Sequence, residues 1–239
     1  MGAPGIEAVA HPRSRLVWDL PVRVMHWGIV IAGAGSYVTQ KIVDDWFSAH
    51  VWFGYTMLVL VTTRIVWGFV GSRHARFASF VRGPAAAWRY ARSLVRDLHE
   101  LHAGHNPVGG WMVIVLLAML LTQAVTGLFA NDEIIETGPL FGYVSVATSD
   151  ALTSLHEDLF DWLLVAAGAH VVAVLMYLFV RRENLIAPMI TGRKPAEWVR
   201  ADEAIDRSRA WLAVLIAAIL AAALAWVVSS APEASLSFL

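Results

Sequence analysis

The sequence predicts an all-α integral membrane protein, and three observations lead to this fold class. The chain has 239 residues, of which 58% are hydrophobic and only 15% charged, far from the composition of a soluble domain. Five apolar runs are each about 20 residues long, the length that a helix needs to cross a bilayer. Nearly all of the basic residues lie in the segments on one side of these runs. We therefore expect a four-helix transmembrane bundle with a fifth transmembrane helix.

Charge and cysteine content exclude several classes of function. The net charge is −1, so the chain has no general electrostatic attraction to nucleic acid. There is no cysteine. Its absence excludes disulfides, thiolate metal sites, iron–sulfur clusters and the covalent attachment of c-type haem.

The first two predicted spans follow a polar segment, residues 1–20. The first span begins at Pro21, behind Asp19 as a possible cap, and runs to about Gln40. It is too long for the apolar core of a signal peptide and lacks a clear cleavage site, so we interpret it as a retained helix. The second span covers residues 50–70, and its helix is predicted to open at Trp46 with residue 44 or 45 as its cap.

A basic loop, residues 72–108, separates the second and third spans. Within it, Gly83 and Pro84 open a segment to about Leu101 that has Trp88 on an apolar side and arginines on another. Such an amphipathic helix lies on the membrane surface and does not cross it. Residues 106 and 107, an Asn-Pro pair, then cap and start the third span, which runs to about residue 130.

The fourth span is predicted to begin at Ser154, because Ser154 and Glu157 have the spacing of a capping box. With the basic loop, the four spans make up a transmembrane domain over residues 21–182. A cytoplasmic linker, residues 183–209, leads to the fifth span at residues 210–229 and an external tail at residues 230–239.

Basic residues predict the orientation. Of the eighteen Lys and Arg, fifteen fall in the N-terminal segment or in the loops after spans two and four, and Arg23 lies at the start of the first span next to the N-terminal segment. Arg64 lies within span two, and only Lys41 lies on the other side. By the positive-inside rule these parts are cytoplasmic, in a bacterial inner membrane, and the acidic loops lie outside.

Four histidines fall within the predicted spans, where an ionisable residue is costly and therefore functional by default. His156 and His170 are fourteen residues apart, so they lie on one face of the fourth helix at depths about 21 Å apart. Given the orientation, His26 matches His170 in depth near the cytoplasmic leaflet, and His50 matches His156 near the external leaflet.

Two histidines from different helices at one depth can bind the two faces of a porphyrin held in a bundle. A porphyrin plane also needs small neighbours, and glycines in the spans provide them, although they equally permit close helix packing. These glycines are Gly28, Gly33, Gly54, Gly127 and Gly168. Arg64 would either neutralise a haem propionate near His26 and His170 or extend to lipid phosphates.

Other interpretations remain open. A closed zinc site gathers four ligands, which these pairs are too far apart to provide. Histidines could also relay protons in a transporter, which requires no pairing by depth. His99, His102 and His105 are interpreted as residues of a solvated loop, and the tryptophans mostly as anchors at the membrane interface.

Four stretches carry a family resemblance: RVMHW at 23–27, HVWFGY at 50–55, RIVWGFVGSRHARF at 64–77 and LTSLHEDLFDWLLVAAGAH at 152–170. Over about residues 15–195 the chain resembles the bacterial cytochrome b561 family, which includes b-type subunits of membrane-bound nickel–iron hydrogenases. The resemblance implies a four-helix bundle with two stacked b haems, whose axial ligands match His26, His50, His156 and His170. The fifth span and the long basic loop exceed the family's minimal pattern.

The resemblance also implies electron transfer between the quinone pool and an external partner, such as a c-type cytochrome or a dehydrogenase. Two alternatives remain. The same haems could oxidise superoxide, with quinone as the second substrate, or the chain could be a proton-coupled transporter without haem.

Overall fold

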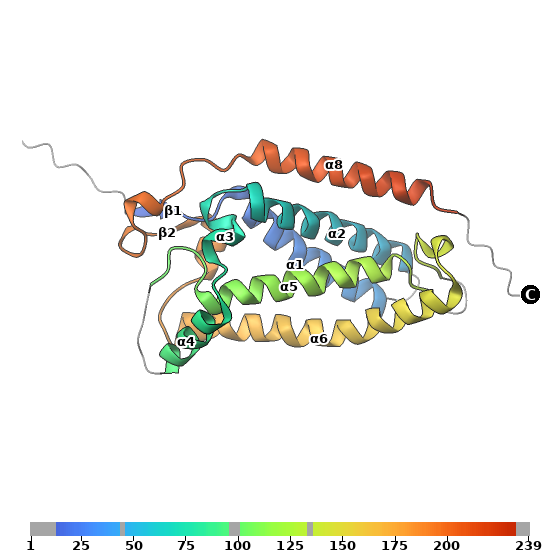
Figure 1. Cartoon of the computed structure of the whole chain (residues 1–239), viewed down its shortest axis with the longest axis horizontal. Helices are drawn as coiled ribbons and strands as arrows, with labels where there is room; N and C mark the ends of the chain where they lie inside the picture. Colours follow the sequence, from blue (N-terminus) through green and yellow to red (C-terminus); the bar gives the residue numbers. More distant parts are fainter. Residues whose placement is uncertain (1–12, 44–45, 96–100, 133–135, 233–239) are drawn as a thin grey trace, which may run out of the picture.

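The long helices of the chain lie lengthwise beside one another (Figure 1). The structure is a computed structural model that describes residues 13–43, 46–95, 101–132 and 136–232. The helices are α1 (Leu20–Lys41), α2 (Phe47–Val70), α5 (Pro107–Gly127), α6 (Val146–Phe179) and α8 (Ala210–Ser229). Helices α1 and α2 pack along each other, α5 packs on α6, and α8 lies against α2. This helical bundle confirms the predicted fold class.

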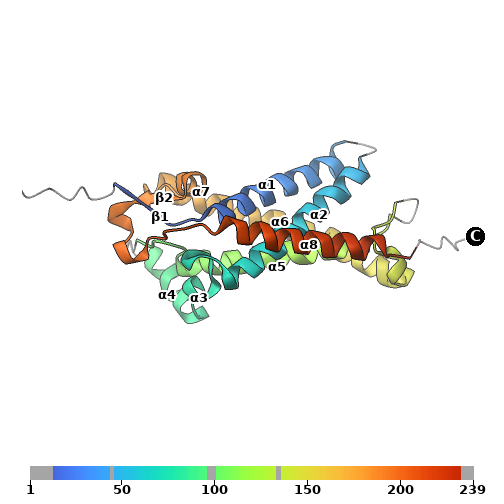
Figure 2. The ribbon, with the colours of Figure 1, turned by 90° about the horizontal axis from the view of Figure 1, so that it is seen from above.

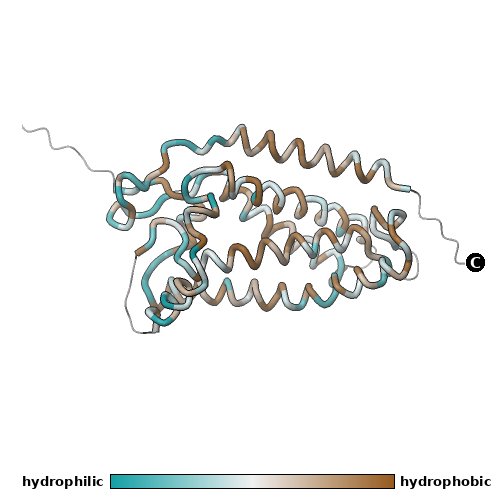
Figure 3. The backbone as a smooth tube through the Cα atoms, viewed as in Figure 1, coloured by the Kyte–Doolittle hydropathy of each residue, from teal (hydrophilic) through white to brown (hydrophobic). Residues whose placement is uncertain are grey.

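Within the described residues, four helices are long and apolar enough to cross a membrane: α2, α5, α6 and α8. Figure 3 shows their hydrophobic colouring, with hydrophilic segments gathered at the ends of the bundle. Helix α1 has 22 residues but does not reach the same hydropathy, because Arg23 and His26 lie in its first two turns. That α1 also crosses the membrane remains a prediction, supported by its position alongside α2.

Asp19 caps α1, as predicted, and also ties it to α2. One carboxylate oxygen accepts the Val22 amide at 2.7 Å and the other accepts the Trp67 indole N–H at 2.9 Å. All three groups are buried. Trp67 and its neighbour Trp18 are core residues, so their interpretation as interface anchors is wrong.

The predicted start of α5 is confirmed, and the predicted start of α6 is wrong. Asn106 caps α5 by accepting the Gly109 amide at 2.7 Å, as expected. Helix α6 instead begins two turns earlier than predicted, at Val146 behind Ser145 as its cap. Ser154 lies inside the helix, where its hydroxyl bonds the Asp150 carbonyl oxygen at 3.0 Å. The predicted Ser154–Glu157 capping box is therefore wrong, because Ser145 caps the helix earlier in the chain.

Most of the short elements lie at one end of the bundle, opposite the loop 128–145 that connects α5 to α6. We call this end the basic end. Its elements are β1 (Ser14–Leu16), η1 (Arg73–Ala75), α3 (Phe77–Phe80), α4 (Pro84–Val95), α7 (Ile186–Thr191), β2 (Arg193–Pro195), η3 (Ala196–Trp198) and η4 (Ala201–Glu203). Figures 1 and 2 both place β1, β2, α3 and α4 there. Helix α4 confirms the helix predicted from Pro84, and residues 96–100 lie outside the described residues. The remaining short helix, η2 (Phe141–Tyr143), lies in the loop before α6.

A two-stranded antiparallel sheet, not expected from the sequence, joins the N-terminal segment to the 183–209 segment. In its register Arg15 faces Lys194. The Gly192 carbonyl oxygen accepts the amides of Val17 and Trp18 at 2.8 and 3.1 Å. Gly192 has φ 82°, and a Cβ there would lie 2.7 Å from the Trp18 carbonyl oxygen, so this turn requires glycine.

Candidate functional site

The first pair of histidines lies where α1 meets α6, towards the basic end. The imidazoles of His26 and His170 have ring centres 6.5 Å apart and planes inclined by 58°. They come from positions 144 residues apart in the chain, so only the bundle brings them together. Both rings are half-buried. The pairing expected from helix depth is therefore realised in the structure.

The second pair lies between α2 and α6, towards the other end. The ring centres of His50 and His156 are 6.4 Å apart, with planes inclined by 81°. His156 and His170 both belong to α6, at about 21 Å along its axis from each other. One long helix therefore supplies a ligand candidate to each pair, while α1 and α2 supply the other two.

Both separations fit an iron atom bound by two imidazoles in line. A bond from imidazole nitrogen to a metal is about 2.0 Å long, and the nitrogen lies about 1.1 Å from the ring centre. Two such arms place the ring centres about 6.2 Å apart, close to the observed 6.5 and 6.4 Å. The described residues contain no group of three or more His, Cys, Asp or Glu that could hold a metal ion. Each histidine pair would hold a haem iron through its two imidazoles.

Hydrogen bonds orient the rings of the second pair. His50 Nδ1 lies 3.0 Å from the Ser36 carbonyl oxygen, and His156 Nδ1 lies 2.9 Å from the Gln123 carbonyl oxygen. A carbonyl oxygen only accepts, so each Nδ1 carries the proton and each Nε2 keeps its lone pair for a metal. The hydroxyl of Thr126 adds a contact of 3.3 Å to His156 Nδ1.

The sequence interpretation did not identify the residues that orient these rings, which are Ser36, Gln123 and Thr126. A signal existed, because polar side chains inside apolar spans mark functional positions. Gln123 also donates its side-chain amide to the His156 carbonyl oxygen at 2.9 Å, which links α5 to α6 beside the ring. These residues position the histidines and supply no ligand of their own.

The glycines separate into two groups. A Cβ at Gly54 would meet no atom within 4 Å, and Gly54 lies one turn from His50 on the same face of α2, where a porphyrin plane needs open space. A Cβ at Gly168 also meets no atom, but Gly168 is exposed and lies on the side of α6 opposite His170. A Cβ at Gly28 would instead lie 2.8 Å from Leu60, and one at Gly33 would lie 3.5 Å from Met57. Those two positions serve close approach of α1 to α2.

Gly127 has a third role, because it makes room for an imidazole. A Cβ there would lie 2.8 Å from Cε1 of His156. Any larger residue on α5 would push the His156 ring away from its observed position.

Arg64 lies inside α2 and is 6% exposed. Its guanidinium stacks over the Phe77 ring at 5.5 Å, and Nη1 is buried without a hydrogen-bond partner among the described residues. A buried guanidinium N–H without a partner is costly, so this atom calls for an acceptor. From the sequence, this acceptor is expected to be either a haem propionate near His26 and His170 or a lipid phosphate.

The interpretation of His105 as a solvated residue is wrong. Its ring packs between Trp18 and Phe80, with ring centres at 4.7 and 4.5 Å, and its Nδ1 is buried. Burial lowers the pKa of His105 to about 3, with further lowering by nearby positive charge, first from Arg64. His102 is half-buried beside Tyr90 at 5.3 Å, and His99 lies outside the described residues.

His74, which the sequence interpretation did not single out, is also buried at this end. Its Nε2 donates to the Glu203 carbonyl oxygen at 2.8 Å, and burial lowers its pKa. No local pattern could have revealed this contact, because Glu203 is 129 residues away in the chain.

Comparison with known proteins gives one family and several relatives. The family model of prokaryotic cytochrome b561 matches residues 17–192. A probable Ni/Fe-hydrogenase B-type cytochrome subunit from Rhodobacter capsulatus is 28% identical, over 79% of this chain and 84% of that protein. Proteins of the same name from Bradyrhizobium diazoefficiens and Azotobacter vinelandii are 23% and 25% identical, over 80% and 79% of this chain and 90% and 91% of theirs.

Proposed function

Because the chain belongs to the prokaryotic cytochrome b561 family, we propose that it is a membrane electron carrier that binds two haems b. His26 with His170 holds one haem, and His50 with His156 holds the other. The observation that carries this proposal is the pair of ring-centre distances, 6.5 and 6.4 Å, each matching two imidazoles on one iron. Bound haem b supplies reversible one-electron transfer.

The residues of the chain bind, orient and shield the two groups. The Ser36 and Gln123 carbonyls hold the His50 and His156 rings with Nε2 available, and Gly54 leaves space for a macrocycle. The apolar helices exclude water from the space between the pairs. Arg64 provides the positive charge that balances a propionate near His26 and His170.

The proposed partners are a hydrogenase or another dehydrogenase at one face of the membrane and the quinone pool. The names of the relatives, Ni/Fe-hydrogenase B-type cytochrome subunits, support a hydrogenase. A c-type cytochrome is the other external partner that this function admits. The excess of Arg and Lys at the basic end supports a cytoplasmic N-terminus in a bacterial inner membrane, with His50 and His156 on the external side.

Haem stoichiometry tests the binding proposal. A pyridine haemochrome assay on chain purified from haem-replete cells should give two b haems per chain. Double variants test the pairing: His26→Ala with His170→Ala should leave one haem, because both changes affect the same site. His26→Ala with His156→Ala should leave none. One haem in the second variant, or a colourless wild-type preparation, contradicts the proposal.

Electron transfer is tested by rapid mixing of the haem-loaded chain. Quinol, or hydrogen gas with a purified hydrogenase, should reduce the haems on the time scale of rapid mixing. Superoxide should reduce them more slowly than quinol does. Faster reduction by superoxide than by quinol would favour the superoxide:quinone oxidoreductase alternative.

A further inference from the structure

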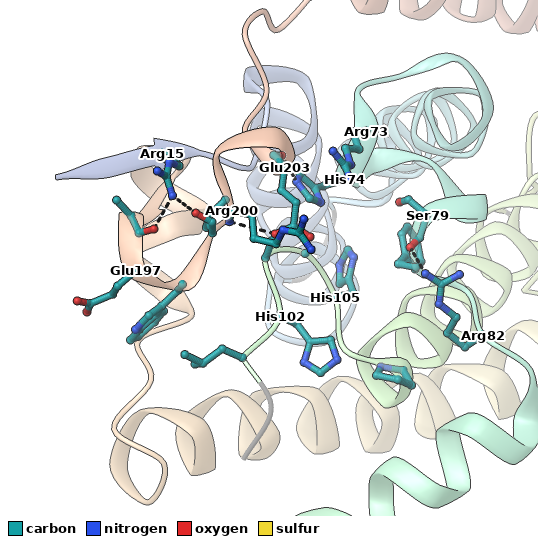
Figure 4. A pocket seen from close by; sticks show the side chains of 18 residues that line it. Arg15, Arg73, His74, Ser79, Arg82, His102, His105, Glu197, Arg200 and Glu203 are labelled. Atoms are coloured by element: carbon teal, nitrogen blue, oxygen red, sulfur yellow. Dashed lines mark hydrogen bonds between the residues drawn. The ribbon is translucent and has the colours of Figure 1, made fainter. Parts of the chain in front are cut away.

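A cavity of about 680 Å³ lies at the basic end, away from the two histidine pairs. Figure 4 shows its side chains converging from β1, η1, the segment after α3, the loop before α5 and the segment around η3 and η4. Its volume is in the range of pockets that hold a whole small molecule. Its wall therefore combines segments that are far apart in the chain.

Positive charge predominates in this cavity. The lining residues include four arginines and two glutamates: Arg15, Arg73, Arg82, Arg200, Glu197 and Glu203. Among these arginines, within the described residues, only Arg200 forms an ion pair, with Asp202 at 3.2 Å. Glu197 is exposed and points away from the histidines in Figure 4. Glu203 is engaged as a cap, accepting the Arg200 amide at 3.1 Å.

The arginines keep donors for a ligand. Arg82 uses one guanidinium nitrogen, Nη2, on the Ser79 carbonyl oxygen at 3.1 Å, and Arg73 uses Nη1 on the Asp202 carbonyl oxygen. A guanidinium has five N–H groups, so most of those on Arg73 and Arg82 remain. His105 also lines the cavity, and its buried Nδ1 has no hydrogen-bond partner among the described residues.

An apolar groove of about 350 Å³ begins at Pro84 and Val108, close in the chain to Arg82 and Pro107 of the cavity wall. It lies between one face of α4 and the start of α5, and its walls are Pro84, Ala87, Trp88, Ala91, Val108 and Trp111. The indole N–H of Trp111 donates to the Arg82 carbonyl oxygen at 2.9 Å. The 82–84 segment therefore forms the boundary between the basic cavity and the apolar groove.

We propose that the basic cavity and the α4–α5 groove together bind one anionic phospholipid. The phosphate lies among the guanidinium groups, including those of Arg73 and Arg82, and an acyl chain lies along Ala87, Ala91 and Trp111. A positive cavity beside an apolar groove, where apolar helices end, matches a molecule with a charged head and a hydrocarbon tail. A quinone is also amphipathic, but its neutral head would not compensate the arginines.

Binding is measured on the full-length, haem-loaded chain in mild detergent, by native mass spectrometry with added phosphatidylglycerol. We expect one tightly retained phosphatidylglycerol per chain and weaker retention of phosphatidylcholine. Each of the substitutions Arg73→Gln and Arg82→Gln should lower affinity about fivefold. Arg76→Gln is the matched control, because Arg76 is exposed in the same segment but does not line the cavity, and it should change nothing.

The acyl chain is tested separately by filling the groove. Ala91→Phe should lower phosphatidylglycerol retention at least as much as one arginine substitution. Ala85→Phe, on an exposed position of α4 outside the groove, should have no effect. Glycerol phosphate carries the same anion without a chain and should compete poorly.

Three results would overturn the proposal. Equal retention of phosphatidylcholine, or equal loss in Arg76→Gln, would indicate non-specific lipid association. Strong competition by glycerol phosphate with no effect of Ala91→Phe would assign the cavity to a soluble phosphate compound. Displacement of the lipid by a short-chain quinone whose own binding is unchanged in Arg73→Gln and Arg82→Gln would assign the site to quinone.

Discussion

Each imidazole has two ring nitrogens, and the partner of one determines the role of the other. At His50 and His156, backbone carbonyls occupy Nδ1, so these rings are fixed before any metal binds. His26 Nδ1 is buried without a hydrogen-bond partner among the described residues. The two candidate haem sites therefore differ in how firmly the chain orients their ligands.

Arg64 should affect one haem and not the other. If it balances a propionate of the haem at His26 and His170, as proposed, replacing it by Met removes a buried positive charge and makes addition of an electron to that haem less favourable. We expect Arg64→Met to lower the reduction potential of that haem by on the order of 50 mV. Arg64→Lys keeps the positive charge and should leave the reduction potential nearly unchanged. Redox titration followed by optical spectra measures both haems, and equal shifts in both would contradict the assignment.

His105 should make the fold sensitive to acid. Its pKa is about 3 when folded, below the ordinary value of 6.5, so the unfolded chain binds a proton that the folded chain does not. Stability from this residue is therefore complete above pH 6.5 and is lost as the pH falls towards 3. The loss at pH 5 is about 2 kcal/mol.

The matching variant is His105→Phe, which preserves packing against Trp18 and Phe80 but has no proton to bind. Unfolding in lipid-free detergent at pH 7 and pH 5 should show a smaller loss of stability for the variant than for the wild type. Equal losses would mean that other groups cause the acid sensitivity.

At the scale of elements, α6 organises the site because it carries one ligand candidate of each pair. Its first two turns are anchored by Ser149, whose hydroxyl donates to the Phe129 carbonyl oxygen at 2.6 Å and accepts from Asn131 at 2.5 Å. This anchoring fixes the register of α6 against α5. His156 then lies opposite Gly127, with no room for a side chain between them.

Gly127→Ala should therefore weaken one haem site selectively. The added Cβ would displace the His156 ring, and we expect about a tenfold to hundredfold loss of affinity for the haem at His50 and His156. The haem at His26 and His170 should be unaffected. Gly33→Ala is the control, since its Cβ would make an ordinary 3.5 Å contact with Met57. Haem titration of the apoprotein measures both, and equal losses would contradict the steric explanation.

At the scale of the whole molecule, a buried ion pair holds the basic end together. Lys194 of β2 lies 3.7 Å from Glu183, just after α6, and donates to the His102 carbonyl oxygen at 2.9 Å. The two charged residues are 2% and 5% exposed. They connect the sheet to the end of α6 and to the loop before α5, and that loop lines the basic cavity.

Replacing only Lys194 should destabilise the chain more than replacing both Lys194 and Glu183. Lys194→Met leaves the Glu183 carboxylate buried without its ammonium partner and should cost about 3–5 kcal/mol. Lys194→Met combined with Glu183→Gln should recover most of that loss, because no unbalanced charge remains. Denaturant unfolding of both variants is the measurement, and an equal cost for the single and double variants would contradict the argument.

The sequence by itself determined the membrane class, the apolar helices, the caps at Asp19 and Asn106 and the pairing of four histidines. These features are local, or follow from helix periodicity and charge placement, so the order of residues carries them. The tertiary structure decided the burial of His105 and Trp67, the β1–β2 sheet and the basic cavity. Each of these depends on contacts between residues far apart in the chain, whose partners no local pattern specifies.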